Sequence, residues 1–74
     1  MSNHKHFELI SLLQTLTGSS YYSLENLLDS YTQSYPNDQK GIDLLTLVIF
    51  SDGPIEDSFV DEVIAHLRTH AKKH

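Results

Sequence analysis

Apolar residues recur at three- and four-residue intervals along most of this chain, which is the spacing of amphipathic helices. The first such stretch covers residues 4–16. Ser2 or Asn3 stands where a helix cap is favoured, and Gly18 stands just after the stretch, where a left-handed residue commonly ends a helix. The pattern therefore predicts a first helix over residues 4–16.

Two longer stretches show the same periodicity. Over residues 21–34 the apolar positions follow the i, i+3, i+4, i+7 pattern, and Pro36 ends the helix because the residue before a proline avoids the α region. Residues 55–72 carry acids near their start and bases near their end, which matches the dipole of a helix. These stretches predict the second and the last helix, and the Ser-Asp-Gly-Pro sequence at residues 51–54 predicts a turn.

The segment over residues 42–50 is apolar at nearly every position, and its β-branched residues would suit a buried strand. A lone strand would have no partner in so helical a chain, so we expect a short helix that follows a polar loop over residues 37–41. The expected fold is all-α, a compact antiparallel four-helix bundle with a short third helix, forming one domain over residues 1–74. Four residues, one from each helix, are expected at its centre: Leu13, Leu28, Leu45 and Val63.

Size and composition narrow the functions open to the chain. With 74 residues and 8.4 kDa, a large internal active-site cavity would consume much of the core. There is no cysteine, which excludes disulfides, thiolate zinc sites and cysteine nucleophiles, and there is no nucleophile-elbow or glycine-rich phosphate motif. We therefore expect no enzymatic activity and no cofactor. The longest apolar run is far below the ~20 residues of a membrane span, so we expect a cytoplasmic location.

Negative charge is concentrated in the middle of the chain. All ten acids lie between Glu8 and Glu62, and Lys40 is the one base among them, so ten minus one leaves −9 over this stretch against −5 for the whole chain. Such a potential repels nucleic-acid phosphate and anionic lipid and attracts basic proteins. The charge therefore predicts that the protein binds neither nucleic acid nor membranes.

Histidines recur at four-residue intervals near the end of the chain, where Glu62 is followed by His66, His70 and His74. Two histidines at this spacing can bind a divalent metal from one helical face. His70 also stands seven residues after Val63, in register with the apolar stripe, where it would pack instead. We predict that this helix end is solvated and forms no metal site. The sequence alone does not decide whether His66, His70 and His74 bind a metal ion.

The predicted second helix combines tyrosines with acids, a composition typical of protein interfaces. Tyr31 is expected to edge the core with its hydroxyl in water, whereas Tyr22 falls on the other face and is expected to be exposed. Long-range attraction by the acids would steer a basic partner toward this helix. Five residues are predicted to bind the partner: Tyr22, Glu25, Asp29, Asp43 and Asp52.

Several short segments resemble the small immunity proteins that neutralise nuclease colicins and pyocins. They are the first apolar stretch with its Ser-Ser turn, Tyr35-Pro36, and the run at residues 41–45, which is similar to the family's His-Pro-x-Gly-x-Asp-Leu-Ile sequence. The resemblance implies an acidic four-helix protein with a short third helix and with Glu25, Asp29 and Asp43 facing the partner. The family's tyrosine pair is replaced by Thr46-Leu47, so its central binding residues are not carried over.

The expected function is thus binding and inhibition of a basic protein, in the manner of an immunity protein against a bacterial nuclease toxin. The alternative is a small homo-oligomeric regulatory or structural module, such as a homodimer, in which the leucine-rich helices pair with a second copy.

Overall fold

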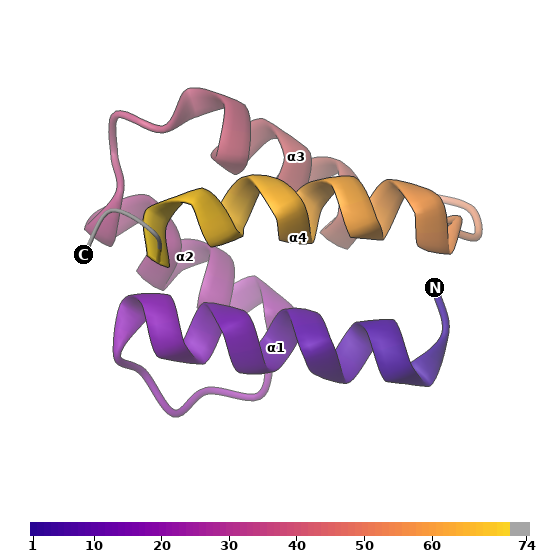
Figure 1. Cartoon of the computed structure of the whole chain (residues 1–74), viewed down its shortest axis with the longest axis horizontal. Helices are drawn as coiled ribbons and strands as arrows, with labels where there is room; N and C mark the ends of the chain where they lie inside the picture. Colours follow the sequence, from indigo (N-terminus) through magenta and orange to yellow (C-terminus); the bar gives the residue numbers. More distant parts are fainter. Residues whose placement is uncertain (72–74) are drawn as a thin grey trace.

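Four α-helices make up the computed structural model, which describes residues 1–71. They are α1 (Asn3–Thr17), α2 (Leu24–Ser34), α3 (Gln39–Ile49) and α4 (Asp57–Ala71) (Figure 1). The all-α, four-helix prediction is confirmed, and α3 shows that the ambiguous apolar segment is helical. No helix in the described part of the chain combines the length and apolar character needed to cross a bilayer.

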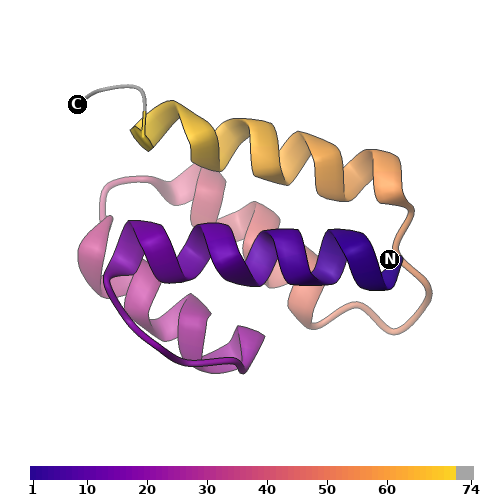
Figure 2. The same cartoon turned by 60° about the horizontal axis from the view of Figure 1, so that its bottom comes forward.

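The helices form a closed arrangement in which α1 and α3 each pack against both α2 and α4. In Figures 1 and 2, α4 lies beside α1 and runs in the same direction, whereas α3 runs antiparallel to α4. Contacts near the two starts fix the parallel pair, because the Ser2 N–H donates to Asp57 at 2.8 Å and the Met1 amino group donates to the Ile55 carbonyl. The connection over residues 18–23 carries the chain back along α1 (Figure 1), which is why α1 and α2 do not form a tight hairpin.

Side-chain caps set where the helices begin. Ser2 caps α1 by accepting from the Lys5 N–H at 3.3 Å, as its position predicted, and Gly18 ends α1 in the left-handed region with φ of 70°. Ser23 caps α2, so this helix begins three residues later than the predicted residue 21. The predicted start was therefore wrong, and Tyr22 precedes α2.

The polar loop predicted over residues 37–41 is shorter than expected. Asp38 accepts a hydrogen bond from the Gly41 N–H at 3.3 Å and so starts α3 at Gln39. An aspartate at this position satisfies a backbone donor that would otherwise remain unpaired at the helix start. The consequence is that the Asp38 carboxylate is held at the beginning of α3, facing the protein rather than solvent.

The core draws on all four helices. Leu13, Leu45 and Val63 are buried as predicted, whereas Leu28 is half-buried and its neighbour Leu27 is fully buried. One position along a helix turns a side chain by about 100°, so a stripe two residues wide does not tell which member lies at its centre. Eleven described residues form the buried cluster: Leu9, Ile10, Leu13, Leu27, Tyr31, Leu45, Val48, Val60, Val63, Ile64 and Leu67.

Candidate functional site

The acids predicted to bind a partner are all exposed, but they lie on different elements. Glu25 and Asp29 stand one turn apart on α2, Asp43 lies on α3, and Asp52 lies in the turn before α4. Tyr22 is 78% exposed, as expected. The Gln39 side-chain amide donates to Asp43 at 2.8 Å, and among the described residues no ion pair neutralises any of these four acids.

Two bases of the described chain form ion pairs away from α2 and α3. Lys5 pairs with Asp61 at 2.5 Å and Arg68 pairs with Glu8 at 3.1 Å, and both pairs join α1 to α4. The hydrogen bond from Lys5 to Asp61 raises the pKa of the lysine. These two bases are therefore engaged on the α1–α4 side of the molecule, whereas Lys40 lies on α3 itself.

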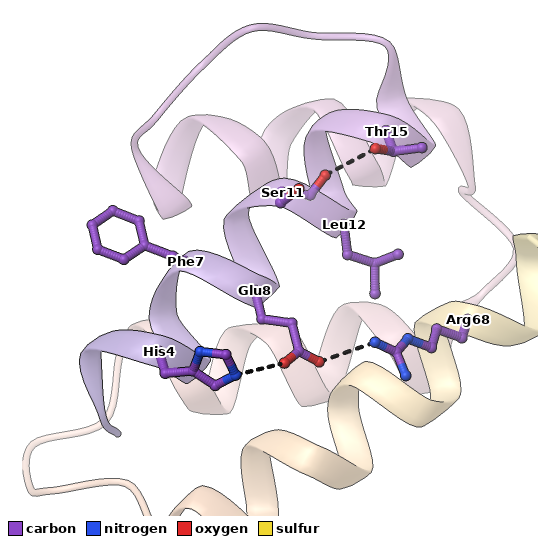
Figure 3. Close-up of a pocket in the computed structure, with 7 residues that line it drawn as sticks. All are labelled: His4, Phe7, Glu8, Ser11, Leu12, Thr15 and Arg68. Atoms are coloured by element: carbon purple, nitrogen blue, oxygen red, sulfur yellow. Dashed lines mark hydrogen bonds and ion pairs between the residues drawn. The ribbon is translucent and has the colours of Figure 1, made fainter.

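A shallow hollow of about 450 Å³ lies along the α1–α4 pair (Figure 3). The Glu8 carboxylate sits between His4, at 3.6 Å, and Arg68, and Phe7 points away from this ion pair. Phe7 is 65% exposed, so its place in the predicted apolar stripe of the first helix does not bury it. The hollow holds a surface ion pair rather than a constellation of catalytic groups.

Sequence reasoning missed an apolar surface at the end of α3. Leu47 and Phe50 are each 59% exposed, and they follow Asp43 at i+4 and i+7, so all three share one face of α3. Leu47 and Phe50 line a hollow of about 440 Å³ together with Ile55 and Phe59 from the following turn and α4. The signal was present in the sequence, because a helix that is apolar all round must either be wholly buried or expose one apolar face.

A polar cluster lies at the opposite end of α3, and the sequence analysis singled out its two histidines but missed that Asp38 and Tyr31 join them. The cluster joins Tyr31 of α2, Asp38 at the cap of α3, and His66 and His70, one turn apart on α4. His66 Nε2 lies 2.9 Å and His70 Nε2 lies 3.0 Å from the Asp38 Oδ2 atom. The Tyr31 hydroxyl donates to the same oxygen at 2.5 Å and lies 2.8 Å from His70 Nε2.

Two side chains of this cluster correct the sequence analysis. Tyr31 has no exposed surface, so its hydroxyl is not in water as predicted but inside the polar cluster. His70 does pack as its register predicted, with its ring stacked on Tyr35 at a centroid distance of 4.3 Å, yet its Nε2 also contacts Asp38. The helix end is therefore not a fully solvated face. His74, the third predicted member of the ladder, lies outside the described residues.

The cluster perturbs the titration of Asp38 and Tyr31. Burial by itself raises the pKa of the Asp38 carboxyl, but hydrogen bonds from Tyr31, from the histidines and from the helix start outweigh burial and hold that pKa below its usual range. Burial and the bond to Asp38 raise the pKa of the Tyr31 hydroxyl above its ordinary value. At neutral pH the cluster thus contains a carboxylate and a neutral phenol donor.

Asp38, His66 and His70 are a set of described residues that could hold a metal ion, since each offers one ligand atom and these atoms all lie within 4.8 Å of one another. Their side chains are 16%, 21% and 14% exposed, respectively. Asp38 and His70 line one surface hollow, of about 360 Å³, and His66 lines another together with Glu62 and Lys40. Solvent therefore reaches a cluster that is otherwise enclosed.

Comparisons of the chain with protein-family models, with curated proteins and with solved structures found no match in any of the three.

Proposed function

We propose that this chain is a non-enzymatic protein that binds a basic protein partner through the exposed faces of α2 and α3. The observation that carries the proposal is the set of exposed acids on α2 and α3 that form no ion pair among the described residues. The ion pairs of Lys5 and Arg68 join α1 to α4, while Glu25, Asp29 and Asp43 are exposed and without an ion pair among the described residues. An acidic surface accelerates the encounter with a cationic protein.

The apolar end of α3 supports the proposal because charge alone gives a fast encounter and a short-lived complex. Leu47 and Phe50 are large, exposed and placed on the same helix face as Asp43. Such anchors contribute most of the binding free energy when a partner removes them from water, while rim charges contribute specificity and rate. Asp52 follows Phe50 by two residues and supplies negative charge beside the apolar anchors.

The specific partner class that we propose is a nuclease toxin domain, which the complex would inhibit. A protein that binds nucleic acid carries a basic surface of its own, and an acidic binder competes for that surface. The resemblance of residues 41–45 to the immunity-protein sequence points to the same class of partner.

The experiment measures association with purified basic nuclease domains of the colicin and pyocin type by stopped-flow fluorescence, together with residual nuclease activity. We expect inhibition of the cognate nuclease, and an association rate that falls at least about tenfold between ~0.05 M and ~0.5 M NaCl. Asp43→Asn is expected to slow association, and Phe50→Ala is expected to speed dissociation at an unchanged association rate.

Glu62→Gln is the matched control, because it removes one negative charge from an exposed position on α4, in the hollow that holds Lys40. The proposal requires Asp43→Asn to slow association more than Glu62→Gln. A rate that does not depend on salt, or equal effects of the two substitutions, would contradict recognition by the α2–α3 surface.

A further inference from the structure

We propose that Asp38, His66 and His70 together bind one divalent transition-metal ion where the start of α3 meets the end of α4. Two imidazole nitrogens and one carboxylate oxygen are a donor set that suits zinc and its neighbours in the first transition row, whereas calcium and magnesium prefer oxygen ligands alone. The site is independent of the acidic surface proposed above.

The distances between donor atoms favour this reading. Metal–ligand bonds of about 2.0–2.1 Å in a tetrahedral zinc site separate neighbouring ligand atoms by about 3.3 Å. The Asp38 Oδ2 atom lies 2.9 Å from His66 Nε2 and 3.0 Å from His70 Nε2, so each of these two pairs needs to move apart by only a few tenths of an ångström, and all three ligand atoms lie within 4.8 Å of one another.

Two of the three ligands, Asp38 and His70, are already held in position by contacts of the kind that surround metal sites. The Gly41 N–H bonds to Asp38, and the Tyr31 hydroxyl donates to the same carboxylate. The ring of Tyr35 stacks on the His70 ring and fixes the plane of that imidazole. Tyr35 is itself held because its hydroxyl donates to the Leu16 carbonyl at 3.3 Å. Such outer contacts orient metal ligands and reduce the entropy lost when an ion binds.

Partial exposure gives an ion a route to the site. The hollow that Asp38 and His70 line is otherwise formed by residues 34–37 of the α2–α3 connection and reaches solvent. Three protein ligands leave the fourth tetrahedral position to water, which enters from this hollow. The inferred centre is thus a three-ligand site with one exchangeable position.

The test titrates ZnCl₂ into the full chain after chelator treatment and dialysis, with isothermal calorimetry near pH 7.5. We expect one ion per chain, and an affinity at least about tenfold lower in Asp38→Asn, His66→Gln and His70→Gln. Asp38→Asn is the informative variant, because asparagine also caps helices well and keeps α3 in place, as far-ultraviolet circular dichroism will verify. Tyr31→Phe removes an outer contact and is expected to weaken binding by about 10–100-fold.

His74→Gln is the matched control, since His70 and His74 share the four-residue spacing and could bind zinc without Asp38. The proposal requires the His74→Gln variant to bind zinc with the same affinity as the unaltered chain. It also requires bound Co²⁺ to give the intense visible absorption of a tetrahedral site. In NMR spectra, zinc must shift the ring signals of His66 and His70 but not those of His4 and His6.

Two results would overturn the proposal. Zinc binding that survives Asp38→Asn and disappears in His74→Gln would assign the ion to the end of the chain. An absence of heat and of ring-signal shifts at millimolar zinc, with the fold intact, would leave the cluster a hydrogen-bond network alone.

Discussion

At the scale of single residues, several polar groups of this small protein are satisfied by partners far away in the chain. Asp57, at the start of α4, accepts the N–H of Ser2, 55 residues earlier. Negative charge is favourable at the start of a helix, and the same carboxylate fixes the chain just before α1. The hydrogen bond from Ser2 and the nearby positive charges of the chain start and Lys5 lower the pKa of Asp57 below its ordinary value of 3.8.

The lowered pKa of Asp57 predicts how acid acts on the α1–α4 contact. The stabilisation is fully present above pH 3.8 and is lost as the pH falls through the lower pKa of the folded state. In ¹H–¹⁵N NMR spectra we expect the Ser2 amide to shift with a midpoint below 3.8. Asp57→Asn, which keeps an acceptor but cannot ionise, should abolish that titration. A midpoint at or above 3.8 would show that the Ser2 bond does not hold the carboxylate in its charged form.

The surroundings of a residue could be predicted from the sequence only where its partners lie nearby in the chain. The cap at Ser2 is one of the two predicted positions, Ser2 or Asn3, and Tyr22 is exposed as predicted, although it precedes α2 instead of lying on one of its faces. The polar cluster was not predicted, because Asp38 meets His66 and His70 across 28 and 32 residues. No local pattern encodes such a meeting, which arises only when α3 packs antiparallel to α4.

At the scale of elements, α3 is the helix whose start depends most on its surroundings. Asp38 caps it and is at the same time the centre of the polar cluster. Gly41, in its first turn, is buried, and a Cβ there would lie 2.9 Å from the Tyr31 hydroxyl and still closer to the Asp38 carboxylate. Both atoms belong to side chains that are fixed by several contacts, so neither yields without breaking hydrogen bonds.

Gly41→Ala is therefore expected to destabilise the protein although alanine favours helices. Overpacking costs about 1–3 kcal/mol, while the gain in helix propensity is at most about 1 kcal/mol. The difference leaves a net loss of up to about 2 kcal/mol, and we expect the free energy of unfolding in urea to fall by about 1 kcal/mol. Gly53→Ala is the control, because nothing lies within 4 Å of its added Cβ, and its effect should stay within about 0.5 kcal/mol. Equal stability of the two variants would mean that Asp38 and Tyr31 move freely.

The boundaries of the elements show which local signals outweigh apolar periodicity. The second helix was predicted from residue 21, yet it begins at Leu24 after the Ser23 cap. The third was predicted from residue 42 and begins at Gln39, after the Asp38 cap. In both cases a side-chain acceptor for an unpaired N–H decided the boundary, and the apolar pattern decided only that a helix exists.

At the scale of the whole molecule, the four helices already enclose the core. The accessible surface is 4722 Å², close to the ~4,600 Å² that the size relation for monomeric proteins gives for 8.4 kDa. The described fold therefore does not present the large excess of surface that a protomer of an obligate dimer exposes when taken alone. Its largest exposed apolar side chains at the end of α3, Leu47 and Phe50, form a local patch.

We accordingly expect the isolated chain to be a monomer in light scattering after size exclusion, with a mass near 8.4 kDa. The net charge of −5 adds mutual repulsion between copies, so the monomer should persist at low salt, where repulsion is screened least. A stable dimer at micromolar concentration would instead favour the homo-oligomeric module. The double substitution Leu47→Ser and Phe50→Ser then identifies the interface. If it converts the dimer to a monomer, the dimer forms through the end of α3, which is the surface assigned above to a basic partner. Dimerisation and binding of the basic partner would then exclude each other.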